Sequence, residues 1–135
     1  MHKFTYQLPL RWADTDAYGH VNNALFLRYL EEARTRMVAD MLPADEAERR
    51  RRAFVVQQSL IDYKAPLDYR EEPVSVDVWV TRSRGARLEL GCAIRDADAT
   101  YAEATIKMAA YDLETGAPRR MTDEELSFFT RYTEA

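Results

Sequence analysis

The sequence contains few of the residues that mark particular protein classes. Its 135 residues include one cysteine, Cys92, so no internal disulfide can form, and the cytoplasm is the expected location. With two histidines and one cysteine, the chain has too few nitrogen and sulfur ligands for a structural zinc site, and nothing in the sequence indicates another metal. Only four glycines and five prolines stand beside 47% apolar residues, which excludes collagen-like and disordered chains.

Several longer patterns are also absent. No run of about 20 apolar residues occurs, so we expect no membrane span. The N-terminal segment lacks the apolar stretch of a signal peptide. The signatures GxGxxG, Walker loop, GxSxG and CxxC are missing, which argues against the usual nucleotide, serine-hydrolase and thiol-redox chemistries. The net charge of −4 argues against nucleic-acid binding, which needs a basic imbalance.

The hydrophobic pattern predicts one domain, residues 1–135, with one long helix among several strands. Residues 24–41 lack glycine and proline and repeat apolar residues at helical spacing, with Asn22 or Asn23 as the cap. Short turns between the strands favour an antiparallel sheet, so we predict an α+β domain of about five strands whose apolar face the long helix covers. The expected strands are residues 4–12, 54–63, 74–81, 88–94 and 101–113, and the expected short helices are 44–52 and, after a capping box at Thr122 and Glu125, 123–132.

The segment before the long helix carries a distinctive motif. It reads RWADTDAYGHVNN over residues 11–23 and continues with Phe26, Tyr29, Glu31 and Ala33-Arg34. This pattern resembles the hotdog-fold acyl-CoA thioesterases, in particular the 4-hydroxybenzoyl-CoA thioesterase-like group, and the likeness extends through the rest of the chain. The resemblance implies a curved antiparallel sheet wrapped around one helix. It also implies an enzyme that hydrolyses acyl-CoA to a free acid and CoA, with no cofactor and no metal.

The resemblance assigns chemical roles to residues of this loop. Asp16 matches the family's catalytic aspartate, a nucleophile or general base, and the backbone N–H of Asn23 is the expected donor that polarises the thioester carbonyl. Gly19 is expected to let the loop pass close to the thioester, because it has no Cβ. His20 is either a second group at the carbonyl or a structural histidine. Asp14 is interpreted as a residue that hydrogen-bonds within the loop.

Other residues extend the predicted site or offer alternatives to it. Glu31 is the alternative acid, because one branch of these enzymes uses a helix glutamate, but it can equally form a structural ion pair with Arg34. The cations of one turn, Arg82, Arg84 and Arg87, are expected to bind the phosphates of CoA. The side chains expected to line an acyl pocket are Phe26, Tyr29, Leu30 and Trp79. Cys92 lies on an apolar strand face and is expected to be buried and inert.

The resemblance further implies a homo-oligomer, either a dimer or a tetramer of two dimers. Family members pair their sheets side by side and build the active site across the interface, and an open sheet edge favours such pairing. Two other functions stay open at this point: an acyl carrier protein thioesterase, and a non-catalytic acyl-CoA-binding protein on the same fold. A hotdog dehydratase is disfavoured, because the long helix has no histidine beyond His20 at its start.

Overall fold

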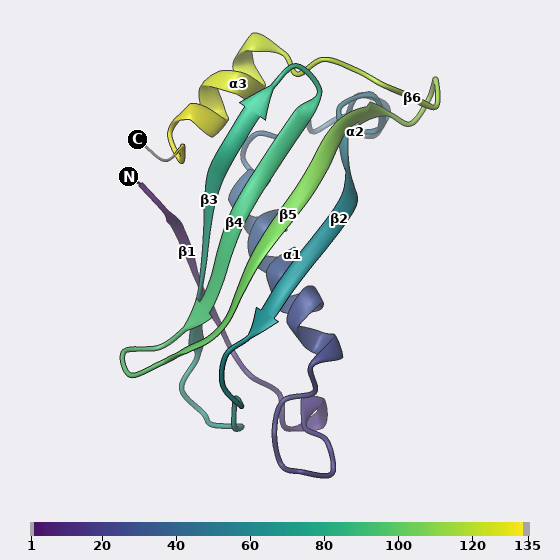
Figure 1. Cartoon of the computed structure of the whole chain (residues 1–135). Helices are drawn as coiled ribbons and strands as arrows, with labels where there is room; N and C mark the ends of the chain where they lie inside the picture. The colour runs from purple at the N-terminus through teal and green to yellow at the C-terminus, as the bar shows by residue number, and fades with distance from the viewer. Residues whose placement is uncertain (1, 134–135) are drawn as a thin grey trace.

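In the computed structural model, which describes residues 2–133, a curled antiparallel sheet wraps around one long helix, α1 (Figure 1). The strand order is β1-β3-β4-β5-β2, and β6 pairs with β5. The strands are β1 (Phe4–Leu8), β2 (Ala53–Tyr63), β3 (Val74–Arg84), β4 (Arg87–Arg95), β5 (Thr100–Asp112) and β6 (Ala117–Pro118). The helices are α1 (Ala24–Val38), α2 (Glu46–Arg51) and α3 (Asp123–Thr130). The predicted α+β architecture is confirmed.

Several predicted boundaries were too long. The first strand ends at Leu8 instead of residue 12, because Pro9 has no N–H for the ladder, and Trp12–Asp14 form a short 3₁₀ turn. Helix α1 ends at Val38 instead of residue 41, and residues 39–41 form a turn before Pro43. The last helix ends at Thr130 instead of residue 132, and the two-residue strand β6 was not among the expected strands.

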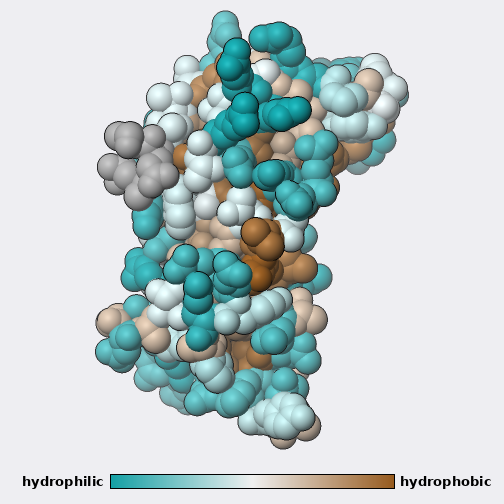
Figure 2. Space-filling view, in the orientation of Figure 1, coloured by the Kyte–Doolittle hydropathy of each residue, from teal (hydrophilic) through white to brown (hydrophobic). Residues whose placement is uncertain are grey.

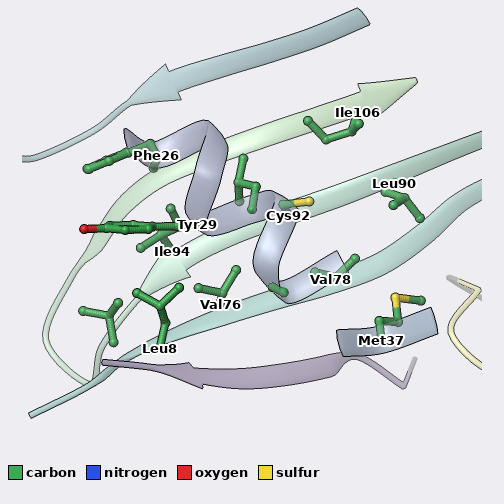
Figure 3. Packing of buried hydrophobic residues seen from close by; sticks show 14 of the residues in the cluster. Leu8, Phe26, Tyr29, Met37, Val76, Val78, Leu90, Cys92, Ile94 and Ile106 are labelled. Carbon is green, nitrogen blue, oxygen red and sulfur yellow. The ribbon is translucent and has the colours of Figure 1, made fainter. Parts of the chain in front are cut away.

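The core lies between α1 and the concave face of the sheet. Alternation along β3 places Val74, Val76, Val78 and Val80 there, each 0% exposed. Helix α1 contributes Phe26, Tyr29, Leu30, Ala33 and Met37 to the same cluster, and Figure 3 shows these side chains meeting those of the strands. Burial of each large side chain contributes about 1.5–3 kcal/mol, so this layer holds α1 against the sheet. Within residues 2–133, no helix is long and apolar enough to cross a membrane.

The outer face of the sheet is mainly hydrophilic, with a hydrophobic area near its middle (Figure 2). Trp79 packs on this face against Gly91 of β4, where an added Cβ would lie 2.4 Å from the indole. The glycine therefore allows the indole to lie flat on the sheet. Residue 79 alternates with the buried valines of β3 and points away from them, and there it borders a hollow with Leu60 and Gly91. Its expected place in an acyl pocket stays a prediction.

The two edges of the sheet differ in length. Strand β1 forms one edge with five residues, whereas β2 forms the other with eleven. Strand β2 carries three exposed apolar or aromatic side chains, Val56, Leu60 and Tyr63, and Leu60 is 63% exposed. Within residues 2–133, β2 pairs only with β5, so its other edge is left without a neighbouring strand.

The capping box that opens α3 is confirmed. Thr122 Oγ1 accepts a hydrogen bond from Glu125 N, and Glu125 Oε1 accepts one from Thr122 N at 2.9 Å. The guanidinium of Arg119 also donates to both oxygens of Glu125, at 2.7 and 2.9 Å. The carboxylate of Glu125 is buried, and these donors compensate the loss of water around it.

Candidate active site

The loop that carries Asp16 closes on itself just before α1. Asp16 N donates to the His20 carbonyl at 2.9 Å, and Gly19 N donates to the Asp16 carbonyl at 3.0 Å. Gly19 has a φ of +79°, the left-handed region that favours glycine. An added Cβ at Gly19 would meet no atom within 4 Å, so crowding within this chain does not require a glycine here. The positive φ of the turn accounts for it.

The side chain of Asp16 is half-buried, and only one of its oxygens is used within the loop. Asp16 Oδ1 accepts the backbone N–H of Tyr18 at 2.9 Å, a turn that orients the carboxylate. Among residues 2–133, no donor is bonded to Asp16 Oδ2. One carboxylate oxygen is therefore available to water or to a substrate.

A second segment, residues 63–68, lies beside this loop. Val21 N donates to the Leu67 carbonyl at 2.7 Å, and His20 Nε2 lies 3.3 Å from Asp68 Oδ1. Arg70 fixes this segment to the turn between β4 and β5, because its Nη1 donates to Asp96 Oδ2 at 2.7 Å. The hydroxyl of Tyr101 and the guanidinium of Arg70 both donate to Asp96 and hold the pKa of its carboxyl well below the usual range.

The first turn of α1 presents a free backbone donor to the same region. Asn22 Oδ1 caps the helix by accepting Ala24 N at 2.9 Å, whereas the side chain of Asn23 makes no capping bond. The hydroxyl of Tyr63 donates to the carbonyl of Asn23 at 3.2 Å. In the described part of the chain, the N–H of Asn23 has no acceptor. This N–H points from the positive end of the helix dipole, where it can hold an anionic oxygen.

These groups border one cleft of about 490 Å³. Three predicted site residues, Asp16, His20 and Asn23, line it together, so the structure brings them to one place. The residues of the cleft that the sequence did not single out for a role are Tyr18, Val21, Tyr63, Lys64, Ala65 and Pro66. Four of these lie at the end of β2 and in the segment that follows it. Its likeness to the family was the only signal that could have indicated them.

Tyr29 lies outside this cleft. Its side chain is 5% exposed, and its hydroxyl donates to Asp14 Oδ2 at 2.8 Å. Burial and the Asp14 carboxylate raise the pKa of Tyr29 above its usual value. Phe26 and Leu30 are likewise buried in the core. Asp14, by contrast, forms the loop-fixing hydrogen bond that its position suggested.

Glu31 and Arg34 lie further along α1. Arg34 Nη2 and Glu31 Oε2 are 4.0 Å apart, so the predicted pair exists but is loose. Glu31 is 64% exposed at its side chain, whereas Arg34 is 15% exposed. Burial lowers the pKa of Arg34, and the charge of Glu31 opposes that shift. Neither residue borders the Asp16 cleft.

The cations of the β3–β4 turn gather as predicted. Arg82, Arg84 and Arg87 border a hollow of about 410 Å³ with Arg120. This turn lies at the end of the sheet opposite to the Asp16 loop (Figure 1). Within one chain, the arginines of this turn therefore lie far from the carboxylate of Asp16.

Cys92 is buried on the inner face of β4, as its alternation predicted (Figure 3). Removal from water raises the pKa of its thiol to about 12. A thiol in this state is a poor nucleophile, because it stays protonated at neutral pH. This placement agrees with the prediction that Cys92 is buried and inert.

The chain is similar to known thioesterases in sequence and in structure. Residues 10–129 match the family model of the thioesterase-like superfamily. The chain is 30% identical over 114 residues to the acyl-CoA thioesterase YbgC of Haemophilus influenzae, with 82% of each chain covered.

Two solved structures have the same fold. A predicted thioesterase from Bacillus stearothermophilus matches with a TM-score of 0.88 and 21% identity, covering 98% of both chains. The Staphylococcus aureus protein SAV2348, solved in complex with CoA, matches with a TM-score of 0.86 and 14% identity, covering 97% of this chain and 84% of its own. The predicted hotdog fold is confirmed.

Proposed function

Because the chain belongs to the thioesterase-like superfamily of hotdog-fold thioester hydrolases, we propose that it hydrolyses acyl-CoA to a free acid and CoA. One observation carries this proposal: a half-buried carboxylate, Asp16, and an unpaired helix N–H, Asn23, border the same cleft. Thioester hydrolysis needs both, a group that attacks or activates water and a donor for the developing oxyanion.

The proposed reaction places the thioester carbonyl oxygen on the N–H of Asn23. The free oxygen of Asp16 then either attacks the carbonyl carbon or removes a proton from a water that attacks it. If Asp16 attacks, the carbon–sulfur bond breaks and an anhydride between Asp16 and the acyl group forms, which water then hydrolyses to the acid and free Asp16. If Asp16 activates water, the water adds to the carbonyl carbon and the carbon–sulfur bond then breaks. In both routes CoA leaves as a thiolate that takes up one proton of the water. The bond from Tyr18 N to Asp16 Oδ1 keeps the other oxygen directed to the cleft. His20 helps to fix the loop through Asp68.

We propose that the phosphates of CoA bind the arginines at the β3–β4 turn of a second copy of the chain. The open edge of β2, with its exposed apolar side chains, supports pairing with another β2. A two-fold axis between antiparallel edge strands places opposite ends of the two sheets side by side. The partner's turn then comes to the end that holds Asp16. The proposed assembly is a homodimer, or a tetramer of two such dimers.

The same arginine turn favours a second candidate, a thioesterase for acyl carrier protein. A cluster of Arg82, Arg84, Arg87 and Arg120 is suited to an acidic carrier surface as well as to CoA phosphates. Comparison of one acyl group on CoA and on the carrier protein separates the two substrates. Preferred turnover of the carrier substrate would replace CoA in the proposal and leave the chemistry unchanged.

The direct test measures release of free CoA from short, long and aromatic acyl-CoAs with a thiol-reactive dye. Since Cys92 is buried, the protein itself contributes little signal. We expect release from at least one substrate. If the protein binds acyl-CoA but hydrolyses neither acyl-CoA nor the acyl group on acyl carrier protein, it is a non-catalytic binding protein. Sedimentation tests the assembly, and a species of only 15.7 kDa at micromolar concentration would contradict it.

A further inference from the structure

A second cavity lies away from the Asp16 cleft, between the C-terminal half of α1 and the inner face of the sheet. It encloses about 340 Å³, a size in the range of small-molecule sites. Most of its lining is apolar and comes from Val38 and Leu42, from the strands and from α3. The strand and α3 residues of this lining are Ala53, Phe54, Leu88, Leu90, Met108 and Phe129. Polar groups enter it only from one side, through α1 and α2.

Arg34 is the most buried of these polar groups, and its guanidinium lacks hydrogen-bond acceptors. Its side chain is 15% exposed, yet no hydrogen-bond acceptor among residues 2–133 is bonded to its guanidinium. The nearest carboxylate oxygen, on Glu31, is 4.0 Å away, which is beyond hydrogen-bond distance. The guanidinium has lost part of its water, although none of its nitrogens is fully buried, and an anion that bonds to it compensates this loss.

The charges around the cavity favour an anion. Arg49 also borders it, but Arg49 Nη1 is occupied by the carbonyl of Ala44 at 2.8 Å. Two arginines and one largely exposed glutamate leave the cavity with a positive balance. Arg34 keeps its planar set of N–H donors free, and this geometry matches the two oxygens of a carboxylate.

We propose that this cavity binds a free carboxylic acid with an apolar body, with the carboxylate on Arg34 and the body against the apolar lining. This rests on the proposed function in one respect, namely that hydrolysis would release such an acid. The site is separate from the reaction centre, because Arg34 lies about 16 Å along α1 from Asn23 by the rise of the helix. A carboxylate held by Arg34 is thus not the carboxyl group that forms at Asn23. The cavity is a second site for the product class.

The test uses octanoate as the probe and measures binding by calorimetry, with the Asp16→Asn variant included because binding needs no turnover. We expect octanoate to bind the wild type and Asp16→Asn alike, and the uncharged octanamide to bind at least tenfold more weakly. Arg34→Gln should weaken octanoate at least tenfold, whereas Arg28→Gln, which changes an exposed arginine of the same helix, should leave it unchanged. Equal binding of octanoate and octanamide, or no binding of octanoate, would overturn the proposal.

Methionine methyl NMR on the unmodified protein shows where the probe lies, even if Arg34→Gln fails to fold. Met108 borders the cavity, whereas Met121 is buried outside it. We expect octanoate to shift the Met108 signal and to leave that of Met121 in place. Binding that leaves Met108 unshifted would place the acid elsewhere and refute the site. Failure of acid binding would leave CoA release intact, and absence of CoA release would leave acid binding measurable, so the two proposals can fail separately.

Discussion

The hydroxyl of Tyr29 donates a hydrogen bond to Asp14 Oδ2 at 2.8 Å, which ties the buried face of α1 to the loop that carries Asp16. Asp14 also fixes the chain through its carbonyl, which accepts Asn22 N at 3.0 Å. The loop geometry before the helix therefore depends on two bonds to one residue. This arrangement gives Tyr29 a role in holding the loop, and the substrate contact that its sequence position suggested stays a prediction.

Tyr29→Phe is expected to lower the free energy of unfolding by about 1 kcal/mol, the usual net contribution of such a hydrogen bond. The ring and its packing against Phe26 remain, so the fold should persist. Urea unfolding measures the loss of stability. Steady-state kinetics should show a lower kcat with little change in KM, because the bond holds the loop that carries Asp16. A raised KM at unchanged stability would mean that Tyr29 contacts the acyl group directly.

Asp16→Asn is expected to reduce acyl-CoA hydrolysis by about a hundredfold or more, the usual effect of removing a positioned base or nucleophile. The amide keeps the size and the acceptor for Tyr18 N, but it can neither attack a thioester nor take a proton from water. Binding of a non-hydrolysable acyl-CoA analogue should be nearly unchanged.

Glu31→Gln is the matched control, because Glu31 is the alternative acid and lies outside the cleft. It should retain most of the activity. An inactive Glu31→Gln beside an active Asp16→Asn would move the catalytic acid to the helix. Two active variants would show that water is activated by another group.

The double variant Arg84→Ala, Arg87→Ala is expected to raise KM for acyl-CoA more than it lowers kcat. Phosphate contacts are the same in the ground state and in the transition state, so their loss weakens both equally. A short acyl thioester without the nucleotide should show no such change. An unchanged KM for acyl-CoA would assign the phosphates to other cations.

If the cations act across the interface, mixing this double variant with Asp16→Asn should raise the rate at acyl-CoA concentrations far below KM, where the double variant is slow. Each mixed dimer then contains one intact site, so random exchange should recover about a quarter of the wild-type rate under these conditions. Mixtures whose rate does not rise above the average of the two variants, although mixed dimers form, would place the two groups in separate sites.

The buried thiol of Cys92 predicts a dependence of stability on pH. Because burial raises the pKa of this thiol to about 12 from its usual value of 9.0, the folded state keeps a proton that the unfolded state loses above pH 9. Stability from this group is constant below pH 9 and falls as pH rises further. Between pH 7 and 10, the wild type should lose about 1.4 kcal/mol relative to Cys92→Ala. Parallel pH profiles of the two proteins would contradict the buried neutral thiol.

The sequence indicated the fold well where local pattern and tertiary packing agree. The alternation of Val74 to Val80 and the helical spacing of Phe26 to Met37 both describe faces that are buried in the structure. The capping box at Thr122 was visible because its two partners are three residues apart. Such features depend on neighbours in the chain, and the sequence contains them directly.

The sequence could not reveal contacts made by residues far apart in the chain. Tyr63 reaches Asn23 only because β2 ends beside the start of α1, and Asp68 reaches His20 for the same reason. The separation of Arg84 from Asp16 likewise depends on strand direction, since the β3–β4 turn and the loop lie at opposite ends of the sheet. The Asp14–Tyr29 bond, which spans fifteen residues, was hidden by the same limit.

The way the Asp16 loop is attached also determines how it can move. It is held by the bond from Val21 to Leu67, by the bond from Tyr29 to Asp14, by the contact of His20 with Asp68 and by bonds within the loop, none of which belongs to the ladders of β3, β4 or β5. The loop can therefore open locally while the sheet stays intact, and its amide hydrogens should exchange with solvent sooner than those of the central strands. The amide of Asn23, which has no acceptor in residues 2–133, should exchange fastest of all. An oxygen bound there would slow that single amide, so exchange at one residue would report occupancy of the cleft without any turnover.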